Sequence, residues 1–116
     1  MQTLFDRILT LLAPEEQIRL RNGNFYRYVG PTSTQINSER FPLAFEYEIS
    51  AQNHKKVTID LIHAMYQLHL QTGVIPSKNE MLPNFLFELR SRPCNYTAAV
   101  YIVQKLINDD FNENNP

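Results

Sequence analysis

Residues 43–49 read LAFEYEI and form the clearest strand pattern in this chain. Successive side chains of a β-strand point to opposite faces. The large apolar side chains of this run therefore share one face, and Ala44, Glu46 and Glu48 share the other. The alternation predicts a strand that packs one face against a core and exposes the opposite face to water.

A second strand is expected shortly before it. Residues 25–29 read FYRYV, which are residue types that strands favour, and Gly23 and Gly30 bound the run. The polar stretch 31–40 is expected to be a loop, longer than most connections in a compact domain. We therefore predict a two-stranded antiparallel ribbon, which must lie against helices because two strands alone are marginally stable.

The residues before the ribbon predict a helical hairpin. Apolar side chains recur at helical spacing over residues 4–12, and Thr3 is a suitable N-cap. Pro14 ends that helix, yet proline also suits the first turn of a second helix over residues 14–20. The pair Asn22-Gly23 supplies the left-handed residue that would end it.

The residues after the ribbon are predicted to be helical. Apolar spacing favours a helix from about Thr58 to Gly73, although Val57, Ile59 and Leu61 also alternate as the end of a third strand would.

Two more helices are expected further along. Ser77 followed by Glu80 is a capping box that opens a helix, and Pro83 interrupts it after little more than a turn. Asn95 or Thr97 is expected to cap a last helix with a wide apolar face.

The predicted fold is therefore a helix-rich α+β domain. It consists of an N-terminal helical hairpin, a two-stranded antiparallel ribbon and three C-terminal helices. We expect residues 1–110 to form a single globular domain, and residues 111–116 to form a disordered tail.

The composition agrees with one small domain. The 116 residues carry 11 basic and 12 acidic side chains, and 43% of them are hydrophobic. No apolar run approaches the ~18 residues of a membrane-spanning helix, and the first residues lack the pattern of a secretory signal. One cysteine, Cys94, cannot form an internal disulfide, so we expect a cytoplasmic protein that does not enter a membrane.

No motif predicts a cofactor or a metal ion. The three glycines do not cluster into a phosphate-binding loop. His63 and His69 lie six residues apart and would point to different sides of a helix. Cys94 is a candidate reactive thiol, although a helix-capping turn is the ordinary explanation for its surroundings. We expect no cofactor, no metal and no catalytic residues.

One enzymatic hypothesis stays open. Glu46 and Glu48 share a strand face, as the carboxylates of a small metal-dependent hydrolase would. Acidic side chains on a half-exposed strand are more often simply solvated, and they also discourage edge-to-edge aggregation.

A second hypothesis is DNA binding through the helices in residues 58–108. In pattern they resemble the tri-helical core of winged-helix DNA-binding domains, and residues 54–105 carry a net charge of +3. Pro83 and the lack of a dense basic cluster depart from that pattern. The candidate DNA contacts are Lys78, Arg90, Arg92, Tyr101, Gln104 and Lys105.

The preferred expectation is a non-enzymatic domain that binds another macromolecule, through a protein partner or through self-association as a homo-oligomer. A ribbon offers an edge and a long loop, where recognition often takes place. The strand aromatics could also stack on single-stranded nucleic acid, although such residues usually pack a ribbon. The candidate protein-binding residues are Arg27, Arg40, Glu46 and Glu48.

Overall fold

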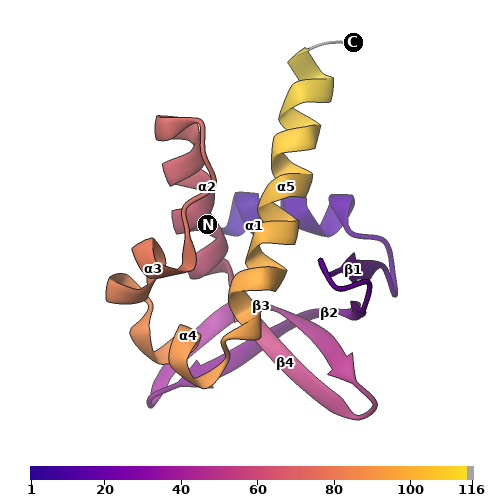
Figure 1. The fold of residues 1–116 in the computed structure, drawn as a ribbon, viewed down its shortest axis with the longest axis vertical. Coiled ribbons are helices and arrows are strands. Elements are labelled where there is room, and N and C mark those ends of the chain that lie inside the picture. Colours follow the sequence, from indigo (N-terminus) through magenta and orange to yellow (C-terminus); the bar gives the residue numbers. More distant parts are fainter. Residues whose placement is uncertain (115–116) are drawn as a thin grey trace.

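A computed structural model describes residues 1–114 and shows an α+β fold, as expected (Figure 1). The elements in chain order are α1 (Gln2–Leu11), β1 (Gln17–Arg19), β2 (Phe25–Ile36), β3 (Glu39–Ser50), β4 (Asn53–Thr58), α2 (Ile59–Thr72), α3 (Lys78–Met81), the 3-10 helix η1 (Leu82–Asn84), α4 (Leu86–Ser91) and α5 (Cys94–Asn114).

The strands form one antiparallel sheet of four, in the order β1-β2-β3-β4, so the predicted two-stranded ribbon is wrong. The expected loop at residues 31–40 is the second half of β2 and the start of β3. Asn37 and Ser38 join them with φ angles of 50° and 68°, which tight hairpin turns favour. Thr34 and Ile36 are buried in this stretch, so its polar composition concealed an alternating strand.

The predicted helical hairpin is also wrong. Helix α1 forms, but its expected partner over residues 14–20 is a turn followed by β1, which pairs with Phe25–Arg27. Ile18 is buried between two exposed neighbours, which is the period of a strand. Gly23 does adopt a left-handed φ of 88°, but it serves the connection between two strands.

Strand β4 was missed because residues 53–56 are polar. Hydrogen bonds to β3 hold these residues in a strand. The strand ends at Thr58, and α2 begins at the next residue. The Thr58 side chain accepts a hydrogen bond from the Leu61 backbone, and Gly73 ends the helix with a φ of 78°. Both predicted ends of this helix are confirmed.

The chain after α2 follows the predicted interruptions. Ser77 and Glu80 form the expected capping box at α3, and Pro83 lies in η1, so the middle helix is split into α3, η1 and α4. The prediction of three C-terminal helices is therefore wrong: the residues up to 114 contain five α-helices, and four of them follow the sheet. Helix α5 extends to Asn114; the predicted tail of residues 111–116 stays a prediction, and residues 115–116 lie outside the described residues.

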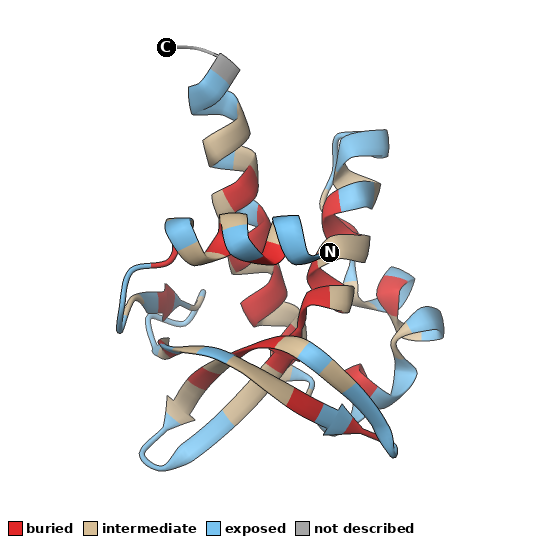
Figure 2. Cartoon of the chain, turned by 180° about the vertical axis from the view of Figure 1, so that it is seen from behind, coloured by how far each residue is buried: buried red, intermediate tan, exposed pale blue. Residues whose placement is uncertain are grey.

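The core lies between the sheet and the helices that stand on it. Figure 2 shows buried segments of α1, α2 and α5 facing the sheet. Phe5 of α1 packs on Phe45 of β3 with ring centroids 4.6 Å apart. The largest fully buried side chains come from every layer: Ile8, Ile18, Phe45, Tyr47, Val57, Ile59, Leu61, Ile62, Met65, Leu89, Ile102 and Leu106.

An ion-pair cluster joins the three long helices away from the sheet. Arg7 of α1 lies 2.8 Å from Asp109 and 2.6 Å from Asp110 of α5, and it also donates a hydrogen bond to Tyr66 of α2. Because Tyr66 donates to Asp110 as well, the cluster links the first and last helices through α2.

A buried carboxylate joins the sheet to the last two helices. Glu88 of α4 is 4% exposed, and its Oε1 accepts a hydrogen bond from the Thr58 hydroxyl at 2.6 Å. Its Oε2 accepts from the Thr58 backbone at 3.0 Å and from the Asn95 amide at 2.8 Å. Asn95 also donates to the Lys56 carbonyl and accepts from Tyr47. The end of β4 and the starts of α2 and α5 therefore meet at Glu88, and Asn95 adds a link to β3.

Glu88→Ala is expected to lower the free energy of unfolding by roughly 3 kcal/mol or more. A buried donor left without an acceptor costs roughly 1–3 kcal/mol. This variant removes the acceptor of three donors, two on Thr58 and one on Asn95. Urea denaturation measures the change, with Glu39→Ala, an exposed carboxylate, as the control that stays within about 0.5 kcal/mol of wild type.

Glu88→Gln separates charge from hydrogen bonding. Burial raises the pKa of Glu88 above its ordinary 4.5, and the bonds from Thr58 and Asn95 only partly offset this. Stability from the protonated form is therefore complete below pH 4.5 and is lost as pH rises through the folded pKa. Glutamine cannot ionise, so the free energy of unfolding of this variant should rise relative to that of wild type as pH increases from 4.5 through the folded pKa. Urea denaturation at several pH values measures it, and a difference between the two proteins that does not change with pH would contradict this account.

Candidate functional site

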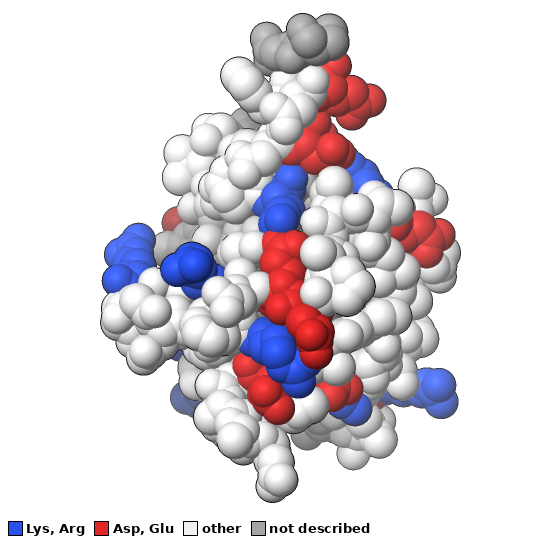
Figure 3. Space-filling view, turned by 90° about the vertical axis from the view of Figure 1, so that its right-hand side faces the viewer, with Lys and Arg blue, Asp and Glu red and all other residues white. Residues whose placement is uncertain are grey.

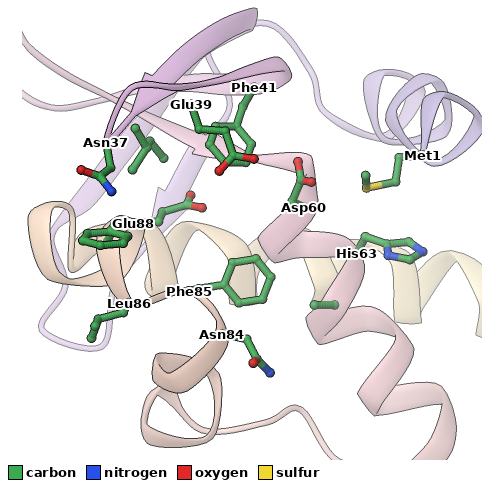
Figure 4. A pocket seen from close by; sticks show the side chains of 13 residues that line it. Met1, Asn37, Glu39, Phe41, Asp60, His63, Asn84, Phe85, Leu86 and Glu88 are labelled. Carbon is green, nitrogen blue, oxygen red and sulfur yellow. The ribbon is translucent and has the colours of Figure 1, made fainter.

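The first candidate site is a groove of about 490 Å³ at the end of the β2–β3 hairpin, which we call the acidic groove. The start of α2, η1 and α4 form its other walls. Figure 4 shows the carboxylates of Glu39, Asp60 and Glu88 and the ring of Phe85 around one opening. The side chains used below are Glu39, Asp60, Phe85, Leu86, Phe87 and Glu88.

The apolar part of the acidic groove is produced by the break at Pro83. The chain leaves η1 at Phe85 and starts the short α4, so that Leu86 and Phe87 remain 39% and 58% exposed while Glu88 and Leu89 turn inward. Large apolar side chains exposed next to one another are typical of binding surfaces. The exposed side of α4 is therefore apolar here, whereas the solvent-exposed face of a helix is usually polar.

Acidic side chains make up most of the charged lining of this groove. Three carboxylates line it and no lysine or arginine does, while Met1 and His63 also border it. Glu88 is engaged with Thr58 and Asn95, but Glu39 and Asp60 form no ion pair within residues 1–114. Asp60 lies in the first turn of α2, where the helix dipole favours a carboxylate. The groove consequently favours ligands that carry positive charge beside apolar groups.

The predicted protein-binding residues are brought together in part, on the outer face of the sheet. Arg27 Nε lies 3.3 Å from Glu48, and His54 of β4 contacts Glu46 through Nδ1 at 2.5 Å and Glu48 through Nε2 at 3.0 Å. Arg40 lies apart from them, at the hairpin end of β3 beside the acidic groove. We call Arg27, Glu46, Glu48 and His54 the outer-face cluster.

His54 was missed in the sequence because it sits directly opposite Glu48 only through the pairing of β3 with β4. The two carboxylates are thus bridged by an imidazole. The described part of the chain contains no group of three or more His, Cys, Asp or Glu side chains placed to hold a metal ion. The metal-dependent hydrolase stays an untested prediction.

The predicted DNA contacts come from α3, α4, the residue that follows α4, and α5. Arg92 donates to Thr34 and to the Lys56 carbonyl, both at 3.0 Å, and so supports the sheet. Lys78 begins α3 and Arg90 is exposed on α4.

The other three DNA candidates lie on α5. Tyr101 and Gln104 border a second groove, between α5 and the β1–β2 connection, and Lys105 forms an ion pair with Glu16 at 2.5 Å. Figure 3 shows a column of alternating acidic and basic side chains, as expected from this pair and from those of Arg27 with Glu15 and Glu48.

Cys94, the candidate reactive thiol, starts α5 and is partly buried. Its Sγ lies 3.2 Å from the Tyr47 hydroxyl, next to the Glu88 network. The thiol therefore belongs to the junction between sheet and helices.

No protein-family model matches this chain, and no curated protein or solved structure matches it with statistical significance. No helix in residues 1–114 is both long and apolar enough to cross a membrane. The case for function accordingly stands on the surfaces of this chain alone.

The outer-face cluster is expected to titrate with pH. Hydrogen bonding to Glu46, and then to Glu48, raises the pKa of His54 above its ordinary 6.5. NMR titration of the His54 ring should show a midpoint above 6.5, and Glu46→Gln should lower it. Glu39→Gln, at the other end of β3, is the control and should leave the midpoint unchanged.

The sign of the stability effect follows from the raised pKa. Stabilisation by the imidazolium is complete below pH 6.5 and disappears as pH rises through the folded pKa. Wild type should lose more stability than His54→Gln over that range. A midpoint at or below 6.5 would rule out this role for the two carboxylates.

Proposed function

We propose that this protein is a non-enzymatic binding domain, and that it contacts a protein partner through the acidic groove. The observation that carries the proposal is that exposed Leu86 and Phe87 lie in one groove with Glu39 and Asp60, whose carboxylates form no ion pair within residues 1–114. Protein interfaces commonly centre on apolar and aromatic anchors with a charged rim.

The expected partner segment carries apolar side chains and lysine or arginine. Apolar groups would cover Phe87 and Leu86, and the cations would meet Glu39 and Asp60. Complementary charge of this kind contributes mainly to association rate and specificity, while the buried aromatic contact contributes most of the affinity. Such a segment is the ligand that the groove accommodates best.

The outer-face cluster is a weaker support for the same function. Arg27, Glu46 and Glu48 already satisfy one another and His54, so a partner would have to replace existing contacts. Arg40 lies near the acidic groove at the hairpin end of the sheet, and it forms no ion pair with any residue in 1–114. The main contact with a partner is therefore expected at the end of the hairpin and not on the outer face of the sheet.

Two labelled peptides of equal length test this function by fluorescence anisotropy. One alternates leucine with lysine, and the other alternates leucine with glutamate. The protein is expected to bind the lysine peptide at least tenfold more tightly, which corresponds to about 1.4 kcal/mol. Phe87→Ser should weaken that binding, and Glu39→Lys should weaken it while improving binding of the glutamate peptide.

Glu113→Lys is the matched control, because it changes the net charge as Glu39→Lys does at an exposed site on α5. Its effect on both peptides should be small. Equal losses from the two lysine variants would show that net charge alone attracts the peptide and would refute the groove. Sedimentation velocity detects the self-association alternative, in which a concentration-dependent dimer is abolished by Phe87→Ser.

A further inference from the structure

The second groove, which we call the tyrosine groove, encloses about 680 Å³ between the β1–β2 connection and α5. This volume lies within the range of small-ligand sites. Its walls come from chain segments far apart in the sequence, since β1 and its turn face the first half of α5. The side chains that carry the inference are Arg19, Arg21, Tyr26, Tyr96, Tyr101 and Gln104.

Three tyrosines give the groove an aromatic lining that is held in place. Tyr96 donates its hydroxyl to the Pro76 carbonyl at 2.7 Å, and Tyr101 donates to Glu16. Tyr26 packs on Tyr47 with ring centroids 5.5 Å apart. All three groove tyrosines remain partly exposed. Rings anchored in this way are arranged in advance for stacking, with little conformational entropy left to lose.

The groove is cationic although the whole chain has a net charge of −1. Arg19 and Arg21 line it, and no aspartate or glutamate does. Both arginines are exposed, and neither forms an ion pair or a side-chain hydrogen bond within residues 1–114, unlike Arg27. These guanidinium groups are free to meet an anion.

Polar amides complete the lining. Gln104 uses its Nε2 to donate to Asn108, which leaves its carbonyl oxygen available as an acceptor. Asn22 accepts from the Asn24 backbone through Oδ1, which leaves its amide NH₂ available as a donor. Groups of this kind contact the edges of unpaired bases and the sugar-phosphate backbone.

We infer that the tyrosine groove binds single-stranded nucleic acid, with tyrosine rings stacking on bases and Arg19 and Arg21 contacting phosphates. Stacking is worth roughly 1–3 kcal/mol per base, and it requires the base faces to be exposed. A duplex hides those faces. A free phosphate would make no use of the rings. Single strands offer both base faces and phosphates.

Fluorescence anisotropy with labelled dT12 and rU12 at about 50 mM salt tests the inference. At least one of these strands should bind tenfold or more tightly than a 12-base-pair duplex. Two phosphate contacts predict a slope of about −1.4 for the logarithm of affinity against the logarithm of salt concentration. Unlabelled thymidine monophosphate should compete poorly, because it offers one base and one phosphate.

Two sets of variants assign the binding to the groove. Arg19→Ala with Arg21→Ala should lower affinity at least tenfold and flatten the salt slope. Arg40→Ala with Arg90→Ala removes the same charge from two other exposed arginines and should change little. Tyr101→Leu should also lower affinity, whereas Tyr101→Phe keeps the ring and should retain it. Circular dichroism checks that each variant is folded.

Three results would overturn the inference: duplex bound as tightly as single strands, equal losses from the two double-arginine variants, or stronger binding of a Glu-Tyr peptide than of either strand. The inference is independent of the acidic groove. Glu39→Lys and Phe87→Ser, which test the protein-binding proposal, should leave oligonucleotide binding unchanged, so that either function can fail alone.

Discussion

The carboxylate of Glu88 imposes the constraint on which the rest of the structure depends. It is buried, and it accepts hydrogen bonds from Thr58 and Asn95. A carboxyl group cannot stay in such a place unless its partners are also in place, because unpaired buried polar groups are costly. Its presence therefore fixes where β4 ends, where α2 begins and how α5 leaves the sheet.

Both grooves follow from that junction. Glu88 points inward from α4, and this leaves Leu86 and Phe87 on the outer side of the same short helix, beside the hairpin. Asn95, the next residue of the network along the chain, ties the start of α5 to β4, and Tyr101 and Gln104 lie further along the same helix. One buried network thus supports an acidic, apolar surface and a basic, aromatic one.

The near-neutral charge of the chain conceals these two surfaces. Its 11 basic and 12 acidic side chains almost cancel, and several of them are consumed in pairs such as Lys105 with Glu16. Among the other charged side chains, Glu39 and Asp60 lie in one groove and Arg19 and Arg21 in the other. Binding preference is set by such local excess, because water and salt screen charges further apart than about 8–10 Å.

Local signals were sufficient for part of the fold. The strand at residues 43–49, the Ser77 capping box and the interruption at Pro83 each rest on neighbouring residues, so the sequence predicts them correctly. The two outer strands of the sheet could not be predicted in this way. Strands β1 and β4 consist of mostly polar residues whose backbone bonds go to another segment, and no local pattern encodes that pairing. The same reason applies to the sites. His54 contacts Glu48, and Arg19 and Tyr101 line one groove, only after distant segments have packed together.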